Sequence, residues 1–148
     1  MIFWDTSALV PLLVVEPESE RALALARRDG ALVVWWGSSV ECASALARLE
    51  REHRLKSAEV DAARDVLSTL RSAWTEVLPS DAVRTHAERL LLRHPLRAAD
   101  ALQLAAALTW AQGSPTSHAF ASYDERLRAA ARGEDFRLAL STTPFPSP

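Results

Sequence analysis

The fold of this chain is decided by its opening stretch, Met1-Ile2-Phe3-Trp4-Asp5-Thr6-Ser7-Ala8-Leu9. Met1 to Trp4 is wholly apolar, which predicts a short strand buried on both faces, as in the centre of a parallel sheet. Asp, Thr and Ser then favour the start of a helix, expected from about Thr6 to Val14. Asp5 is either the cap of this helix or a ligand at the end of a central strand, the usual ligand position of open α/β sheets.

Outward from this stretch, apolar runs alternate with helical stripes. Further strands are expected at Leu32 to Trp36, Trp74 to Leu78, His118 to Ser122 and Phe136 to Leu140. Further helices are expected at 18–28, 38–52, 57–73, 80–94, 98–112 and 124–132. This order predicts an α/β fold in three layers: a parallel five-stranded sheet with helices on both faces. The helices at 38–52 and 57–73 follow one another without a strand, which predicts a helical hairpin standing off the sheet.

Length and composition favour a single domain. The chain has 148 residues, and we expect a domain over residues 1–140 and a proline-rich tail over 141–148. Cys42 is the only cysteine, so a disulfide framework and a thiolate metal cluster are excluded. There is no run of eighteen apolar residues and no basic leader segment, so we expect a cytoplasmic protein without a membrane segment. The net charge of −2 does not predict a broad basic surface for nucleic acid, although a small or metal-mediated contact is compatible with it.

Four acidic residues interrupt apolar surroundings: Asp5, Glu41, Asp100 and Asp124. Each has a structural explanation. Ser38-Ser39-Val40-Glu41 matches a capping box, in which the Glu bonds back to the cap N–H. Asp100 suits the positive end of its helix, and Asp124 suits a helix cap. Taken singly, the acids leave structural and functional roles open.

Taken together, the four acids indicate a site. All of them fall at strand carboxyl ends or helix N-termini, which share one edge in a parallel sheet. Carboxylates gathered there would repel one another and raise their pKa values unless a cation neutralised them. Ligation by oxygen alone suits Mg²⁺ or Mn²⁺ rather than zinc. The typical task of such a metal is to activate water for an in-line attack on a phosphodiester.

These residues resemble the PIN domain family, and within it the VapC-type toxins of prokaryotic toxin–antitoxin pairs. The resemblance runs from Met1 to about Leu140, and it is carried by residues 1–9, 39–41, 99–105 and 122–127. It implies a PIN-like domain that acts as a metal-dependent endoribonuclease, with Asp5, Glu41, Asp100 and Asp124 as the acidic site. In such proteins the three Asp residues hold the metal, and the Glu orients water or a second ion. Ser122 stands where the family often has Thr, and it keeps the hydroxyl.

The resemblance also implies partners. An RNA is the expected substrate, and Arg93 and Arg97 are candidates for contacts with its phosphates, although a solvated surface explains them equally well. A VapB-like antitoxin is expected to cover the site, and a homodimer is expected through the apolar surface around the later helices. The candidates to line a groove for the antitoxin, unless they belong to the core, are Leu12, Leu13, Val15, Leu23 and Leu46.

The sequence disfavours three other classes of protein. A phosphoacceptor receiver domain needs a second acid beside Asp5 and a lysine after the last strand, but the only lysine is Lys56. A haloacid-dehalogenase-like phosphatase needs Asp-x-Asp, and this chain has Asp5-Thr6-Ser7. A catalytically silent scaffold that binds RNA or a partner is disfavoured by the four intact acids.

Overall fold

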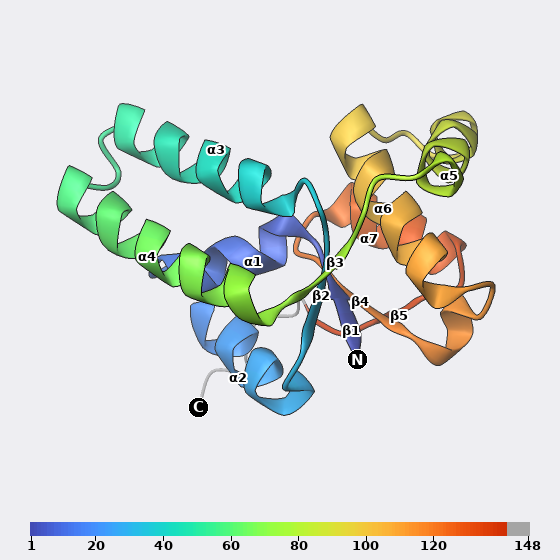
Figure 1. The fold of residues 1–148 in the computed structure, drawn as a ribbon, viewed down its shortest axis with the longest axis horizontal. Coiled ribbons are helices and arrows are strands. Elements are labelled where there is room, and N and C mark those ends of the chain that lie inside the picture. The colour runs from blue at the N-terminus through green and yellow to red at the C-terminus, as the bar shows by residue number, and fades with distance from the viewer. Residues whose placement is uncertain (142–148) are drawn as a thin grey trace.

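A computed structural model describes residues 1–141, which form a five-stranded parallel sheet between two layers of helices (Figure 1). The strands are β1 (Ile2–Trp4), β2 (Leu32–Trp35), β3 (Thr75–Val77), β4 (Ala119–Ala121) and β5 (Arg137–Leu138). The predicted fold is confirmed. The strands are shorter than the apolar runs because these runs continue past the sheet, as the exposed side chains of Trp36 and Leu78 show. The predicted tail lies outside the described residues, except for Ser141.

Seven α-helices within residues 1–141 cover the two faces of the sheet. One face carries α1 (Thr6–Leu13), α2 (Ser19–Asp29), α3 (Ser38–Arg51) and α4 (Ser57–Ala73). The other carries α5 (Asp81–Arg93), α6 (Ala98–Ala111) and α7 (Glu125–Gly133), and a short 3₁₀ turn, Pro115–Ser117, precedes β4. The helices α3 and α4 pair and extend beyond the sheet, which confirms the predicted hairpin (Figure 1). Within residues 1–141, no helix has both the length and the apolar composition needed to cross a lipid bilayer.

The central strand β1 contributes to two hydrophobic cores, one on each side of the sheet. Phe3 stacks on Phe120 with 5.5 Å between ring centroids, in the core beneath α5, α6 and α7. Trp4 faces the opposite core, and its indole N–H donates to Asp29 at 3.0 Å. Both side chains are fully buried, as expected where successive residues of a central strand point to opposite faces.

The strand order places a crevice at the end of β1. The order is β3-β2-β1-β4-β5, so the chain moves outward from β1 to β3 and then returns to β4 over the other face. A ligand crevice forms in such sheets beyond the carboxyl ends of the two strands where the direction reverses, here β1 and β4. Receiver domains follow the order 2-1-3-4-5, so this topology also excludes them. Asp5 directly follows β1 and therefore lies at this crevice.

Candidate functional site

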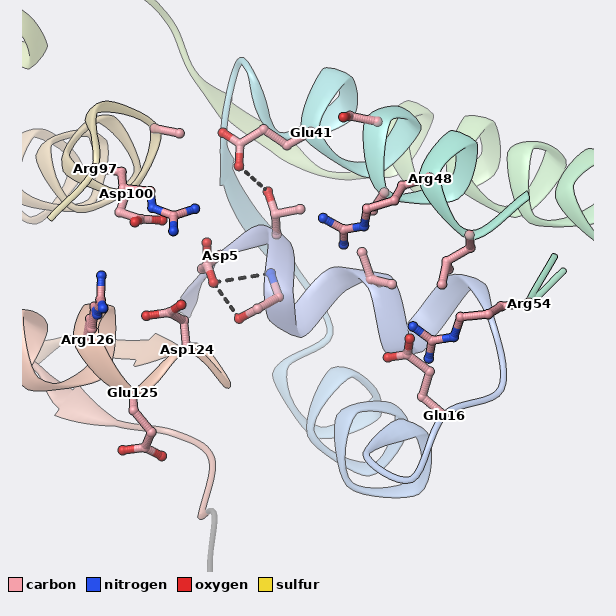
Figure 2. A pocket seen from close by; sticks show the side chains of 17 residues that line it. Asp5, Glu16, Glu41, Arg48, Arg54, Arg97, Asp100, Asp124, Glu125 and Arg126 are labelled. Atoms are coloured by element: carbon pink, nitrogen blue, oxygen red, sulfur yellow. Dashed lines mark hydrogen bonds between the residues drawn. The ribbon is translucent and has the colours of Figure 1, made fainter. Parts of the chain in front are cut away.

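A cleft of about 890 Å³ lies at this edge of the sheet, and all four predicted acids line it (Figure 2). Asp5 follows β1, and Glu41 lies in the first turn of α3. Asp100 lies in the first turn of α6, and Asp124 caps α7. The structure therefore brings together acids from four separate segments, as the sequence predicted. Their roles in catalysis and in metal binding stay predictions.

Asp5 is the most deeply buried of the four acids. Its side chain is 4% exposed, and its Oδ2 atom accepts hydrogen bonds from Ser7 N at 3.1 Å, Ser7 Oγ at 2.5 Å and Ser122 Oγ at 2.9 Å. Burial is the main reason why the pKa of Asp5 is raised from 3.8 to about 6, and the charge of Glu41 adds to the rise. Within residues 1–141 these bonds all go to Oδ2, and no hydrogen bond is found at Oδ1. Asp5 is therefore both a helix cap and a ligand candidate.

Glu41 does not form the capping box that the sequence suggested. The cap of α3 is Gly37, without a side-chain cap bond. Glu41 Oε2 instead accepts hydrogen bonds from Thr6 Oγ1 at 3.0 Å and Gln103 Nε2 at 3.3 Å. Burial raises the pKa of Glu41, and the negative charge of Asp100 raises it further. The capping interpretation is wrong because partners from α1 and α6 hold this side chain in the cleft.

Gln103 is a buried residue beside the cleft to which the sequence alone assigned no role. It is 0% exposed, and its Nε2 atom also lies 2.9 Å from Thr6 Oγ1 and 3.1 Å from Ser38 Oγ. This single amide therefore connects α6 with α1 and α3. The available signal was an uncharged polar side chain between Leu102 and Leu104, on a helix that is apolar nearly all round.

Asp100 and Asp124 form the opposite side of the cleft. Asp124 Oδ1 accepts a hydrogen bond from Leu127 N at 2.8 Å, so the predicted cap exists although the residue also lines the cleft. Burial raises the pKa of Asp100, and the charge of Asp124 adds to this, whereas Arg97 and Arg126 lower it. Structural and functional roles are therefore compatible at these positions.

The chemistry of these acids fits a hard divalent cation. Within residues 1–141, no three acidic, His or Cys side chains already stand close enough together to enclose a metal ion. Asp5 Oδ1, Glu41 Oε1 and Asp124 Oδ2 nevertheless stand outside the hydrogen bonds described above. Such a donor set, made only of carboxylate oxygens, suits Mg²⁺ or Mn²⁺.

Arginines line the same cleft at both of its ends. Arg97 and Arg126 lie beside Asp100, and Arg48 and Arg54 follow along α3 and the loop after it (Figure 2). Of the two arginines singled out in the sequence, Arg97 lines the cleft. Arg93 instead forms an ion pair with Glu134 at 3.2 Å and lies outside the cleft lining.

The apolar residues proposed to line a partner groove divide into three groups by burial. Leu13 and Leu46 belong to the hydrophobic core, so the groove interpretation is wrong for them. Leu12 is half-buried against the same core. Val15 is 99% exposed and Leu23 is 41% exposed, so these two side chains stay available to a partner.

Comparison with known proteins identifies the family. The PIN domain family model matches residues 2–133, so the chain belongs to the PIN domain family. It is 35% identical over 143 residues to ribonuclease VapC45 of Mycobacterium tuberculosis strain CDC 1551, with 94% of each chain covered. The identity and coverage are the same for ribonuclease VapC49 of strain H37Rv. The chain is thus a VapC-type member of the family.

Solved structures agree on the fold. The chain is similar to FitAcB from Neisseria gonorrhoeae, with a TM-score of 0.64 and 17% identity over 93% of this chain and 96% of the other. It is also similar to PAE2754 from Pyrobaculum aerophilum, with a TM-score of 0.60 and 21% identity over 89% and 85% of the two chains. At these identities the likeness concerns the fold.

Proposed function

We propose that this protein is a metal-dependent endoribonuclease, the toxin of a type II toxin–antitoxin pair, which hydrolyses RNA phosphodiesters with Mg²⁺ or Mn²⁺. The observation that carries the proposal is the meeting of Asp5, Glu41, Asp100 and Asp124 in one cleft. The names of the M. tuberculosis relatives, which are ribonucleases, support the choice of RNA as the substrate.

Each acid has a role in this proposal. Asp5, Asp100 and Asp124 would hold the cation, because they surround the crevice beyond β1 and β4. When bound, a divalent cation would polarise the phosphate and supply a water of lowered pKa. Glu41, held through Oε2 by Thr6 and Gln103, would use Oε1 to orient that water. The Ser7 and Ser122 hydroxyls would fix the Asp5 carboxylate as it binds the cation.

The proposal includes a VapB-like antitoxin and a homodimer in the cytoplasm. Exposed Val15 and Leu23 give a partner segment apolar contacts near α1 and α2. An arginine or lysine of the partner would replace the cation between the acids, because the cleft favours positive charge. Leu91 and Leu92 are exposed on α5 and support a dimer contact at the later helices. Co-purification with the product of the neighbouring reading frame tests the antitoxin, and light scattering tests the dimer.

The activity is tested with purified protein and single-stranded or loop-containing RNA. We expect cleavage with Mg²⁺ or Mn²⁺, loss of cleavage in chelator, and products with 5′-phosphate and 3′-hydroxyl ends, because activated water attacks without the 2′-hydroxyl. Asp100→Asn should nearly abolish cleavage and keep the fold. A 2′,3′-cyclic phosphate or full activity in chelator would contradict this mechanism. A protein that binds RNA and never cuts it would be the silent scaffold instead.

A further inference from the structure

We propose that Arg48 binds a backbone phosphate of the RNA adjacent to the phosphate that is cut, so that the strand runs along α3 away from the acids. This inference rests on the proposed function, and it adds a binding position that lies outside the four acids. The relevant surface is the wall of the cleft that α3 provides.

One face of α3 forms this wall. The residues of α3 that line the cleft are Glu41, Ser44, Ala45, Arg48 and Leu49. Their spacing of three and four residues places them on a single stripe of the helix. Glu41 and Arg48 are two turns apart, about 10 Å along the helix axis. The wall therefore carries a site acid at one end and a cation further along.

Arg48 is free to bind an anion. It is exposed, and no ion pair of Arg48 is found within residues 1–141, although carboxylates line the same cleft. Figure 2 shows its guanidinium directed along the cleft toward the end occupied by Asp5. Arg54, further along, is directed toward Glu16 and lies 3.9 Å from Glu52. Arg48 is therefore the more available of the two cations on this side.

The chemistry of the wall matches a polyanionic strand. A guanidinium binds phosphate with two parallel N–H donors, which fixes position as well as charge. The side chains of Ser44 and Ala45 are small, so they leave room for the backbone between Arg48 and the acids. A cleft of four carboxylates repels an RNA strand, and a cation beside it offsets that repulsion. Arg48 thus attracts the RNA backbone, which the four carboxylates repel.

The test compares Arg48→Ala with Arg51→Ala, because Arg51 is an exposed arginine on the same helix that does not line the cleft. For Arg48→Ala we expect KM for a single-stranded RNA to rise about tenfold and kcat to stay within about twofold, as for the loss of one charged hydrogen-bonded contact. The slope of log affinity against log salt should become shallower by about 0.7. Arg48→Lys should recover part of the affinity, and Arg51→Ala should match the wild type.

A binding measurement separates this inference from the proposed function. Labelled single-stranded RNA is titrated with Asp100→Asn protein that carries or lacks Arg48→Ala, so no cleavage is needed. Weaker binding with a shallower salt slope supports the phosphate contact even if the wild type cuts no RNA. Equal binding of the two proteins overturns it. The inference is also overturned if Arg48→Ala protein binds RNA as the wild type does but is no longer inhibited by the co-purified partner. The wall formed by α3 would then be a protein interface.

Discussion

At the scale of single residues, burial of the Asp5 carboxylate lowers the stability of the folded protein, and the role of Asp5 as a helix cap does not explain this loss. A capping Asp typically stabilises a protein by about 1 kcal/mol. Asp5 is nevertheless only 4% exposed, and the negative charge of Glu41 acts on its carboxylate. Burial, together with this charge, raises the pKa of Asp5 to about 6, so its ionised form is disfavoured. A rise of about two pKa units corresponds to roughly 3 kcal/mol at neutral pH. A residue kept at such a cost fits a functional requirement for negative charge in the cleft.

Asp5→Asn is therefore expected to stabilise the metal-free protein. Because the pKa of Asp5 is raised in the folded state, that state binds more protons than the unfolded state between about pH 4 and pH 6. The free energy of unfolding of the wild type should fall, relative to the variant, as the pH rises through this window. Urea unfolding in chelator should show a gain of up to about 3 kcal/mol at pH 7 and none below pH 4. Asp61→Asn, on the exposed side of α4, is the control, and an equal gain there would contradict the prediction.

Gln103 is expected to support both stability and activity. Gln103→Leu removes the buried amide beside Thr6, Ser38 and Glu41, and leaves an oxygen of each of these side chains with one partner fewer. Loss of such a buried partner costs about 1–3 kcal/mol in the free energy of unfolding. Because Glu41 also loses a donor, kcat should fall while KM changes little. Urea unfolding and steady-state kinetics give the two readings.

Leu102→Ala, at the neighbouring half-buried position of α6, serves as a control that lowers stability without touching the hydrogen bonds of Glu41. A variant Gln103→Leu with a wild-type kcat would show that Gln103 has a purely structural role. If both variants lose kcat equally, the effect comes from packing of α6 and not from the amide.

At the scale of elements, the order of strands and helices could be predicted from the sequence, whereas the contacts between elements could not. The apolar run at 1–4 and the stripes at 38–52 and 57–73 each depend on neighbours along the chain. The capping box at Glu41 is equally local, and it failed because its competitors, Thr6 and Gln103, are 35 and 62 residues away. The acids could be found from their positions at strand and helix ends, and the buried amide that orders Glu41 could not.

A cluster of charges joins α5 to the end of α7. Glu134 is 8% exposed, and its carboxylate contacts Arg89 at 3.0 Å, Arg93 at 3.2 Å and His94 at 2.9 Å. Burial alone would raise the pKa of Glu134, but the hydrogen bonds from His94 and Arg89 lower it overall. The cluster therefore holds the loop that leads from α5 into α6, on which Arg97 lies.

Glu134→Gln should destabilise the protein by about 1–2 kcal/mol, a value between those of exposed and buried ion pairs. Because the pKa of Glu134 is lowered in the folded state, its contribution is present above the ordinary carboxyl pKa and is lost as the pH falls through the folded value. Thermal unfolding at pH 7 and in acid measures this difference. Glu88→Gln, an exposed position on α5, is the control. A loss that persists unchanged in acid would contradict the electrostatic explanation.

At the scale of the whole molecule, the fold gathers like charges at one place. The chain adds strands outward from β1 to β3 and then returns to add β4 on the other side of β1, so segments far apart in sequence end at one cleft. Helices on both faces fix these segments through two separate cores. The acids therefore cannot move apart freely, and burial together with mutual repulsion raises the pKa values of Asp5, Glu41 and Asp100.

A divalent cation that neutralises these acids should stabilise the folded protein, because it binds the assembled cleft and not the unfolded chain. At a cation concentration of 100 times Kd the gain is about 2.7 kcal/mol. We expect Mn²⁺ to raise the melting temperature of the wild type at pH 7.5. The rise should be larger than at pH 5, because protons compete for the buried Asp5 carboxylate below its pKa of about 6. Asp5→Asn should start with a higher melting temperature and gain little from Mn²⁺, whereas Asp61→Asn should respond like the wild type. Equal gains for Asp5→Asn and the wild type would place the cation elsewhere on the molecule.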